Sequence, residues 1–241
     1  MTPHARKNIY QGLLIVSLAL GLLSFTSNLS LGQQLPPPPS TPPINTTRSG
    51  GALSASNACS SNNEPVIALV PVKNPVLTTS KYPTFLFYIP YGSKDVSFGE
   101  FSVLTWPNEV TRLYRTRFTL PETPGIVSIS LPVLPKYALA ESVSYHWYFK
   151  LYCKGSTSSS TDIKVDGWVQ RVKMNAARER AISASSPEIW YDALARLGDR
   201  LRTSPQDGEL RNRWCNLLET IGSEDLAKET LVGPVQVLQK D

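Results

Sequence analysis

The chain is short of the residues on which most enzyme chemistry depends. It has two histidines, His4 and His146, and three cysteines without a Cys-x-x-Cys pair, so it lacks the usual spacing of zinc ligands. It also lacks the GxSxG, P-loop, GxGxxG and HExxH motifs. We therefore expect no enzyme, no cofactor and no catalytic, cofactor-binding or metal-binding residues.

Charge is also scarce, at 18% of residues, and the formal net charge of +5 is modest. Arg6 and Lys7 lie in a segment that we expect to be removed, which leaves 22 of the 24 basic residues against 19 acidic ones. This surplus is too small to indicate a nucleic-acid partner. The chain is instead rich in turn residues and aromatics, with 20 Pro, 14 Gly and 10 Tyr, a profile that favours a β-rich exported domain.

Residues 1–32 have the pattern of a signal peptide. Arg6 and Lys7 precede an uncharged run of about 14 residues, 12–25, which is short for a membrane span of roughly 20. Ser30 and Gly32 then supply the small residues of a cleavage site. We expect cleavage after Gly32 and a periplasmic or secreted protein with no stable membrane span, although an uncleaved anchor is the alternative.

Residues 33–63 have the composition of a disordered linker. The run PPPPSTPP at 36–43 favours semi-rigid polyproline II, and Thr, Ser, Asn and Gly follow it. A spacer is the simplest interpretation, and a proline-rich ligand for a partner module is the alternative. Asn45-Thr46-Thr47 also matches a glycosylation acceptor, which matters only in a eukaryotic host.

Residues 64–173 alternate with a period of two, which predicts a β domain. Seven candidate strands are separated by turn residues: 66–70, 84–89, 98–106, 111–120, 126–131, 143–153 and 163–172. No helical pattern lies between them, so we expect antiparallel pairing. The fold class predicted is α+β, with an antiparallel β-sandwich of immunoglobulin or fibronectin type followed by helices.

The clearest strand is 143–153, in which two sets of side chains alternate. Tyr145, Trp147, Phe149 and Leu151 share one side and should enter the core. The other side carries His146, Tyr148, Lys150 and Tyr152. In the next strand, the alternation changes near Gly167, which predicts a register shift or bulge there.

Residues 174–232 predict a helical hairpin packed on the sandwich, with 233–241 as a tail. Ser186-Pro187-Glu188 and Ser204-Pro205-Gln206-Asp207 are helix starts, and Gly222 is a helix end. Two apolar stripes follow these starts and include Trp190 and Trp214. A weaker helix over about 175–184 should precede them.

The hairpin resembles one tetratricopeptide unit, because Pro205 follows Ala193-Leu194 at that repeat's spacing. One unit is less than the roughly three that a free-standing array needs. We therefore expect the helices to dock on the sandwich through their tryptophans, and a peptide-binding groove is the alternative.

Four ordered blocks of sequence carry a more particular resemblance. They are 82–90 (YPTFLFYIP), 123–132 (TPGIVSISLP), 167–172 (GWVQRV) and 189–194 (IWYDAL). Together they resemble the cyanobacterial exported "domain of unknown function 928" family from about residue 59 to residue 231. The resemblance implies an exported cyanobacterial protein with a β domain followed by helices and no established activity. Residues 182–188 depart from that family's Tyr-Ala-x-x-Gly lead into the last block, which leaves the helix start open.

Cys59 and Cys153 are the natural disulfide pair in an oxidising compartment, because the bridge would tie the segment before the first strand to the strongest strand. The family resemblance also places a cysteine at both positions. Cys215 is left over beside Trp214, and a buried free thiol is its simplest role, because a nucleophile would need an imidazole.

The candidate binding or interdomain surface consists of His146, Tyr148, Tyr152, Trp190 and Tyr191. Aromatic rings with polar tips suit a face that binds sugar or protein, but the same strand face could be covered by the helices, which we prefer. We predict an envelope protein that works as a non-enzymatic binding or scaffolding module with an unknown envelope protein or polysaccharide as partner. The alternative is a cell-envelope carbohydrate-acting hydrolase, which would hold two carboxylates across an open cleft.

Overall fold

The computed structural model describes residues 42–48, 59, 64–74, 76–155 and 163–238. The predicted signal peptide and most of the predicted linker lie outside these residues. No helix within the described part of the chain is long and apolar enough to cross a membrane.

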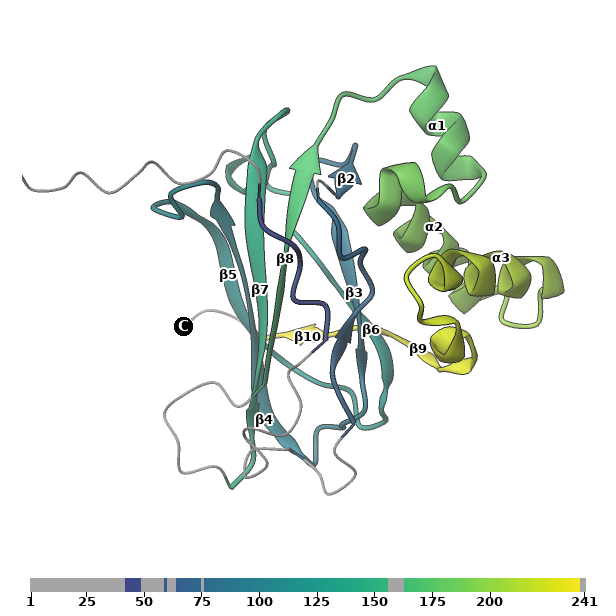
Figure 1. Cartoon of the computed structure of the whole chain (residues 1–241). Helices are drawn as coiled ribbons and strands as arrows, with labels where there is room; N and C mark the ends of the chain where they lie inside the picture. The colour runs from purple at the N-terminus through teal and green to yellow at the C-terminus, as the bar shows by residue number, and fades with distance from the viewer. Residues whose placement is uncertain (1–41, 49–58, 60–63, 75, 156–162, 239–241) are drawn as a thin grey trace, which may run out of the picture. The chain divides into compact units, whose positions relative to one another are not determined.

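Within the described residues, ten strands form two mixed sheets (Figure 1). The four-stranded sheet has the order β1 (Ile67–Ala68), β3 (Thr84–Ile89), β6 (Gly125–Ser130) and β9 (Leu231–Pro234). The six-stranded sheet has the order β10 (Gln236–Val237), β5 (Arg112–Thr119), β4 (Val96–Thr105), β7 (Ser144–Cys153), β8 (Ile163–Arg171) and β2 (Leu77–Thr78).

The predicted antiparallel sandwich of immunoglobulin or fibronectin type is therefore wrong. Two of the pairings are parallel, β6 with β9 and β2 with β8, so both sheets are mixed. The strands that make these parallel pairs have four and two residues, too few to show an alternating pattern in the sequence. The fold is mostly β with a few helices.

The core lies between the two sheets. Tyr145, Trp147, Phe149 and Leu151 of β7 are all buried there, as their alternation predicts. Phe149 stacks on Phe87 of β3 with ring centroids 4.0 Å apart. The register shift predicted near Gly167 is absent, because β7 and β8 pair without a break from Ser144↔Gln170 to Leu151↔Ile163.

Gly167 interrupts the apolar pattern for a different reason, which is close packing. A Cβ at this position would lie 2.5 Å from Trp147 Cζ2, so only a glycine lets this indole pack against β8. The next residue, Trp168, consequently faces outward.

The helical part follows β8. It comprises α1 (Ala176–Ser183), α2 (Trp190–Thr203) and α3 (Gly208–Glu219), together with the short helices η2 (Pro187–Ile189) and η3 (Glu224–Lys228). Another short helix, η1 (Pro135–Tyr137), lies between β6 and β7. Ser186 caps η2 through Glu188 N, and the Asp207 side chain caps α3 by accepting from Leu210 N at 3.0 Å. Gly222 has a left-handed φ of 63° just after α3.

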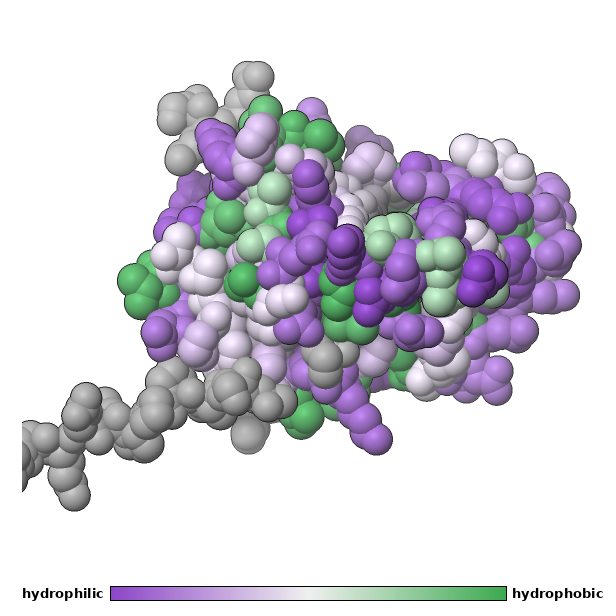
Figure 2. Space-filling model, turned by 90° about the horizontal axis from the view of Figure 1, so that it is seen from above, coloured by the Kyte–Doolittle hydropathy of each residue, from purple (hydrophilic) through white to green (hydrophobic). Residues whose placement is uncertain are grey.

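The helices pack beside β3, β6 and β9, on the outside of the four-stranded sheet (Figure 1). Their own outer surface is mostly hydrophilic, as the right-hand side of Figure 2 shows, because the apolar stripes point inward. After η3 the chain returns to the sheets as β9 and β10, so the segment predicted as a tail, 233–241, supplies strand residues.

Part of the predicted linker also belongs to the fold. Thr46 bridges to Asp166 of β8, and Arg48 bridges to Ile67 of β1, so residues 42–48 connect the edges of the two sheets. Asn45 is only 4% exposed, and its Oδ1 accepts a hydrogen bond from Trp168 N at 2.9 Å. This side chain is thus occupied within the fold and is not an open glycosylation acceptor.

The predicted disulfide is present. Cys59 and Cys153 are bonded, with their Cα atoms 4.9 Å apart and a separation of 94 positions in the sequence. The bridge ties the segment before β1 to the end of β7. Cys215 is a free, half-buried thiol in α3.

Candidate functional site

The outer face of the six-stranded sheet is the candidate functional site. Helices α1, α2 and α3 lie on the other side of the molecule, against the four-stranded sheet (Figure 1). The outward set of β7, predicted as His146, Tyr148, Lys150 and Tyr152, faces away from the core. The preferred interpretation of this set, that the helices cover it, is therefore wrong: the helices cover the opposite sheet.

His146 is the centre of this face and is almost fully buried. Its Nδ1 is hydrogen bonded to Glu109 Oε1, and its Nε2 lies 3.0 Å from Asp166 Oδ2. The ring also stacks on Trp168, with centroids 3.9 Å apart and planes at 11°. Both nitrogens and one ring face of the imidazole are consequently occupied by the protein itself.

Glu109 reaches His146 from the turn between β4 and β5. Its backbone has a left-handed φ of 51°, which is uncommon for a residue with a side chain and costs about 1 kcal/mol. The carboxylate offsets that cost, because it also accepts a hydrogen bond from Tyr148 Oη at 3.0 Å. Burial, and then this bond to Glu109, raise the pKa of Tyr148, so its hydroxyl stays protonated.

Asp166 and Lys164 extend the cluster along β8. Lys164 Nζ lies 3.2 Å from Asp166 Oδ1 and 4.6 Å from the centre of the Tyr148 ring. Burial raises the pKa of Asp166, but the hydrogen bond to His146 and the charge of Lys164 outweigh it, so the pKa is lowered overall. Asp166 is therefore held as a carboxylate.

Trp106 and Trp168 enclose the histidine from the side. Their rings meet edge to face at 5.8 Å, and Trp106 approaches His146 in the same way at 6.4 Å. The indole Nε1 atoms of both, like that of Trp214 in the helices, are buried without an acceptor among the described residues. Ring packing therefore holds these two side chains in place.

The other half of the face is cationic and aromatic. Phe98 of β4 stacks on Tyr152 of β7 at 4.4 Å, and the Arg117 guanidinium lies 4.7 Å above the Phe98 ring. The nearby Glu100 is buried and accepts a hydrogen bond from Arg115 Nη2. This half of the face therefore presents guanidinium and ammonium groups that rest on ring faces.

Trp190 and Tyr191, at the start of α2, lie on the core side of the sheet and do not join the candidate site on its outer face. Trp190 Nε1 donates to the Leu69 carbonyl at 2.8 Å. Tyr191 Oη accepts from Trp147 Nε1 and donates to the Trp168 carbonyl. Both side chains are buried, so they anchor the helix on the sheets and offer no exposed surface.

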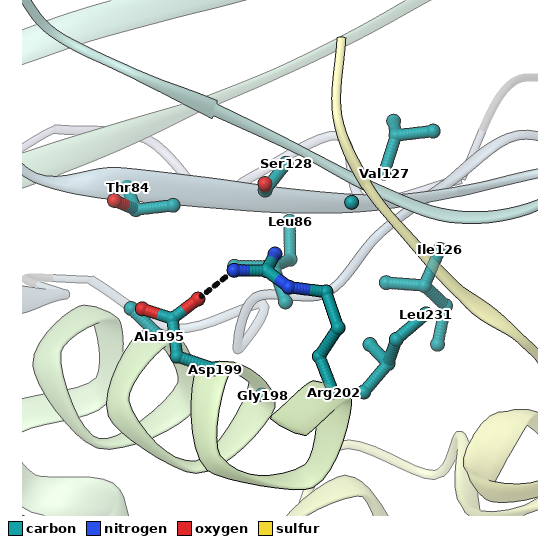
Figure 3. Close-up of a pocket in the computed structure, with 11 residues that line it drawn as sticks. Thr84, Leu86, Ile126, Val127, Ser128, Ala195, Gly198, Asp199, Arg202 and Leu231 are labelled. Atoms are coloured by element: carbon teal, nitrogen blue, oxygen red, sulfur yellow. Dashed lines mark hydrogen bonds and ion pairs between the residues drawn. The ribbon is translucent and has the colours of Figure 1, made fainter. Parts of the chain in front are cut away.

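Two cavities lie on the helical side of the molecule. One, of about 20 Å³, sits between α2 and the outer face of β3, β6 and β9, where Arg202 pairs with Asp199 (Figure 3). It has room for about one water molecule. The other has a volume of about 310 Å³ and is lined by Pro71, Lys73, Val76, Leu77, Pro187, Glu188, Trp190 and Thr220.

Glu109, Asp166 and Trp168 belong to the site although they were not among the residues predicted from the sequence. In the structure, antiparallel pairing of β7 with β8 brings Tyr148 opposite Asp166 and His146 opposite Trp168. Continuous pairing of the two predicted strands indicates the same neighbours, but the register shift predicted at Gly167 would have separated them. Among the described residues, no group of three or more His, Cys, Asp and Glu side chains is arranged to hold a metal ion.

The family model for a Domain of Unknown Function (DUF928) matches residues 45–231, more than half of the chain. The chain belongs to the DUF928 family. No curated protein and no solved structure matches it. The DUF928 region begins at Asn45, whose side chain accepts a hydrogen bond from Trp168 N, and ends at the first residue of β9. It therefore includes the edge segment 45–48, both bridged cysteines and the whole His146 cluster.

Proposed function

We propose that this DUF928 protein is an exported, non-enzymatic binding module of the cell envelope, and that its ligand binds on the outer face of the six-stranded sheet. Export is supported by the charged start and the short apolar run within residues 1–32. The Cys59–Cys153 bridge adds support, because disulfides persist mainly in oxidising compartments outside the cytosol.

The binding role rests on one observation, the difference between the two sheets. Helices cover the outer face of the four-stranded sheet, whereas the outer face of the six-stranded sheet carries aromatic and charged side chains held in fixed positions by one another. Side chains ordered in advance lose little entropy when a ligand binds. An outer face of this kind suits recognition better than it suits a purely structural role.

The arrangement around His146 argues against catalysis. An imidazole that acts as general base needs a free nitrogen within reach of its substrate, and both nitrogens of His146 are bonded to carboxylates. Cys215 lies in α3 on the opposite side of the molecule, so it is not paired with this ring.

The alternative function, a carbohydrate-acting hydrolase, finds less support. Its two carboxylates would face each other across a space that admits a sugar. Glu109 and Asp166 are the closest candidates, but the imidazole of His146 fills the space between them. They act as partners of the histidine.

Co-sedimentation with an isolated envelope fraction tests the binding role. The mature protein and a control with Arg180→Gln and Arg200→Gln, both exposed on the helices, should sediment equally. A variant with Lys150→Gln and Lys164→Gln on the sheet face should remain in the supernatant. Equal sedimentation of all three proteins would contradict the proposed face, and release of reducing sugar ends by the mature protein would favour the hydrolase.

The intact mass of the exported product tests the compartment. We expect the product to begin at Gln33, as cleavage after Gly32 requires. A cytosolic product that retains Met1 would contradict export.

A further inference from the structure

We propose that the ligand of this face is an acidic polysaccharide, one that carries carboxylate or sulfate groups, and that three cations in a row across the sheet bind it. The proposal rests on the proposed function, because it names the ligand class of the same face. It concerns Arg117 of β5, Lys150 of β7 and Lys164 of β8, together with Glu100 of β4.

These four residues lie in one line across the sheet. Glu100 is directly opposite Arg117 on one side and Lys150 on the other, and Lys150 is directly opposite Lys164. Neighbouring strands are about 4.8 Å apart, so the row extends over about 14 Å. That length suits several units of an extended polymer better than a single small anion.

The acids of this face are already paired, and Glu100 and Asp166 are also buried, whereas the cations reach the surface. Glu100 is 5% exposed and binds Arg115, while Glu109 and Asp166 are bonded to His146. Side chains of Arg115 and Lys164 are 47% and 46% exposed. A ligand that approaches this face therefore meets positive charge.

Lys150 and Lys164 form a like-charge pair in which only Lys164 has an acidic partner, Asp166. Like charges directly opposite each other on neighbouring strands destabilise a sheet. Both ammonium groups lie over the Tyr148 ring, at 5.6 Å and 4.6 Å from its centroid. Of the two lysines, only Lys164 forms an ion pair, with Asp166, and no ion pair among the described residues includes Lys150 or Arg117. An anion between the two lysines would relieve their repulsion.

The aromatic rings of the face favour a polysaccharide over a single-stranded nucleic acid. Nucleic-acid bases bind such surfaces by stacking on open ring faces. Here Phe98 is covered by Tyr152 and Arg117, and Tyr148 is contacted by His146 and both lysines. The rings hold cations in position and leave hydrogen bonds and charge as the means of recognition.

Titration calorimetry with defined polymers tests the assignment. The probes are a polyuronate, a neutral glucan of the same length and single-stranded oligothymidylate, each at low and at moderate salt. The mature protein should bind the polyuronate, bind it less tightly as salt rises, and leave the neutral glucan unbound. The Lys150→Gln/Lys164→Gln variant should bind about tenfold or more weakly, whereas Arg180→Gln/Arg200→Gln, which removes the same charge from the helices, should bind as the mature protein does.

Two results would overturn the acidic ligand while leaving the binding module intact. One is equal binding of the neutral glucan with no effect of the two lysines, and the other is tighter binding of the oligothymidylate. Failure to bind both these probes and the envelope fraction would overturn the binding module as well. Thermal melting of each variant shows that a loss of binding does not come from unfolding.

Discussion

The outer faces of the two sheets differ in what their side chains contact. On the four-stranded sheet, the outward side chains of β3 and β6 include Thr84, Leu86 and Ser128, small or apolar groups that lie against α2 (Figure 3). On the six-stranded sheet they are long, charged or aromatic, and they contact one another across the strands. The side chains of the first face pack against a helix, whereas those of the second face pack against one another.

The largest effect should come from Trp190→Ala, on the covered side. The side chain is buried, and its indole hydrogen bonds to Leu69, so its loss should cost about 3–5 kcal/mol of the free energy of unfolding. Because α2 packs on strands of both sheets, calorimetry should show the whole protein melting earlier in one transition. If the helices melted in a separate transition and the melting temperature of the sheets did not change, the helices would be an independent module.

Loss of the disulfide should have a similar effect. Cys59→Ser opens the loop between two cysteines that are 94 positions apart, and the chain-entropy model gives about 4.7 kcal/mol for such a loop. Urea unfolding of the variant beside the parent measures this value. Cys215→Ser is the matched control, because that thiol is free, and it should unfold within about 0.5 kcal/mol of the parent.

His146→Ala should cost about 3 kcal/mol, because it leaves Glu109 and Asp166 without their partner in a buried setting. Tyr148→Phe, which removes only one hydrogen bond to Glu109, should cost about 1 kcal/mol. The two values, measured by urea unfolding, distinguish a structural histidine from an exposed one. A loss below 0.5 kcal/mol for His146→Ala would mean that the face is not held rigid by this ring.

Acid should weaken the same cluster. The pKa of Asp166 is lower in the folded protein than its ordinary value of 3.8, so its contribution to stability is present above that value and is lost as the pH falls through the folded pKa. Asp166→Asn should be less stable than the parent at pH 6, and the gap should close below about pH 3.8. A gap that stays constant or widens in acid would show that Asp166 is not stabilised as a carboxylate.

Much of the fold follows from local pattern. The six longer strands lie within two residues of their predicted bounds, because each alternates over at least six residues and ends at turn residues. The inward set of β7 and the Cys59–Cys153 pair are also confirmed. Such features depend on neighbours in sequence or on a simple count of cysteines.

The parts that sequence could not predict depend on distant segments. Strand β2 has two residues, and β9 contains Gly233 and Pro234, so neither has a pattern that predicts a strand or its parallel partner. The same applies to the site. Glu109 is in a turn of left-handed backbone, and nothing nearby in sequence indicates that it meets His146. Which sheet the helices cover was likewise undetermined, because both faces of β7 are aromatic.

Lysine footprinting tests whether the ligand binds on the outer face of the six-stranded sheet, which no helix covers. The mature protein is acetylated with and without the envelope fraction, and mass spectrometry measures the reactivity of each lysine. Lys150 and Lys164 should lose reactivity when the fraction is present, while Lys136 and Lys173, exposed elsewhere, should react as before. Unchanged reactivity at Lys150 and Lys164, with protection at Lys173 instead, would contradict the account.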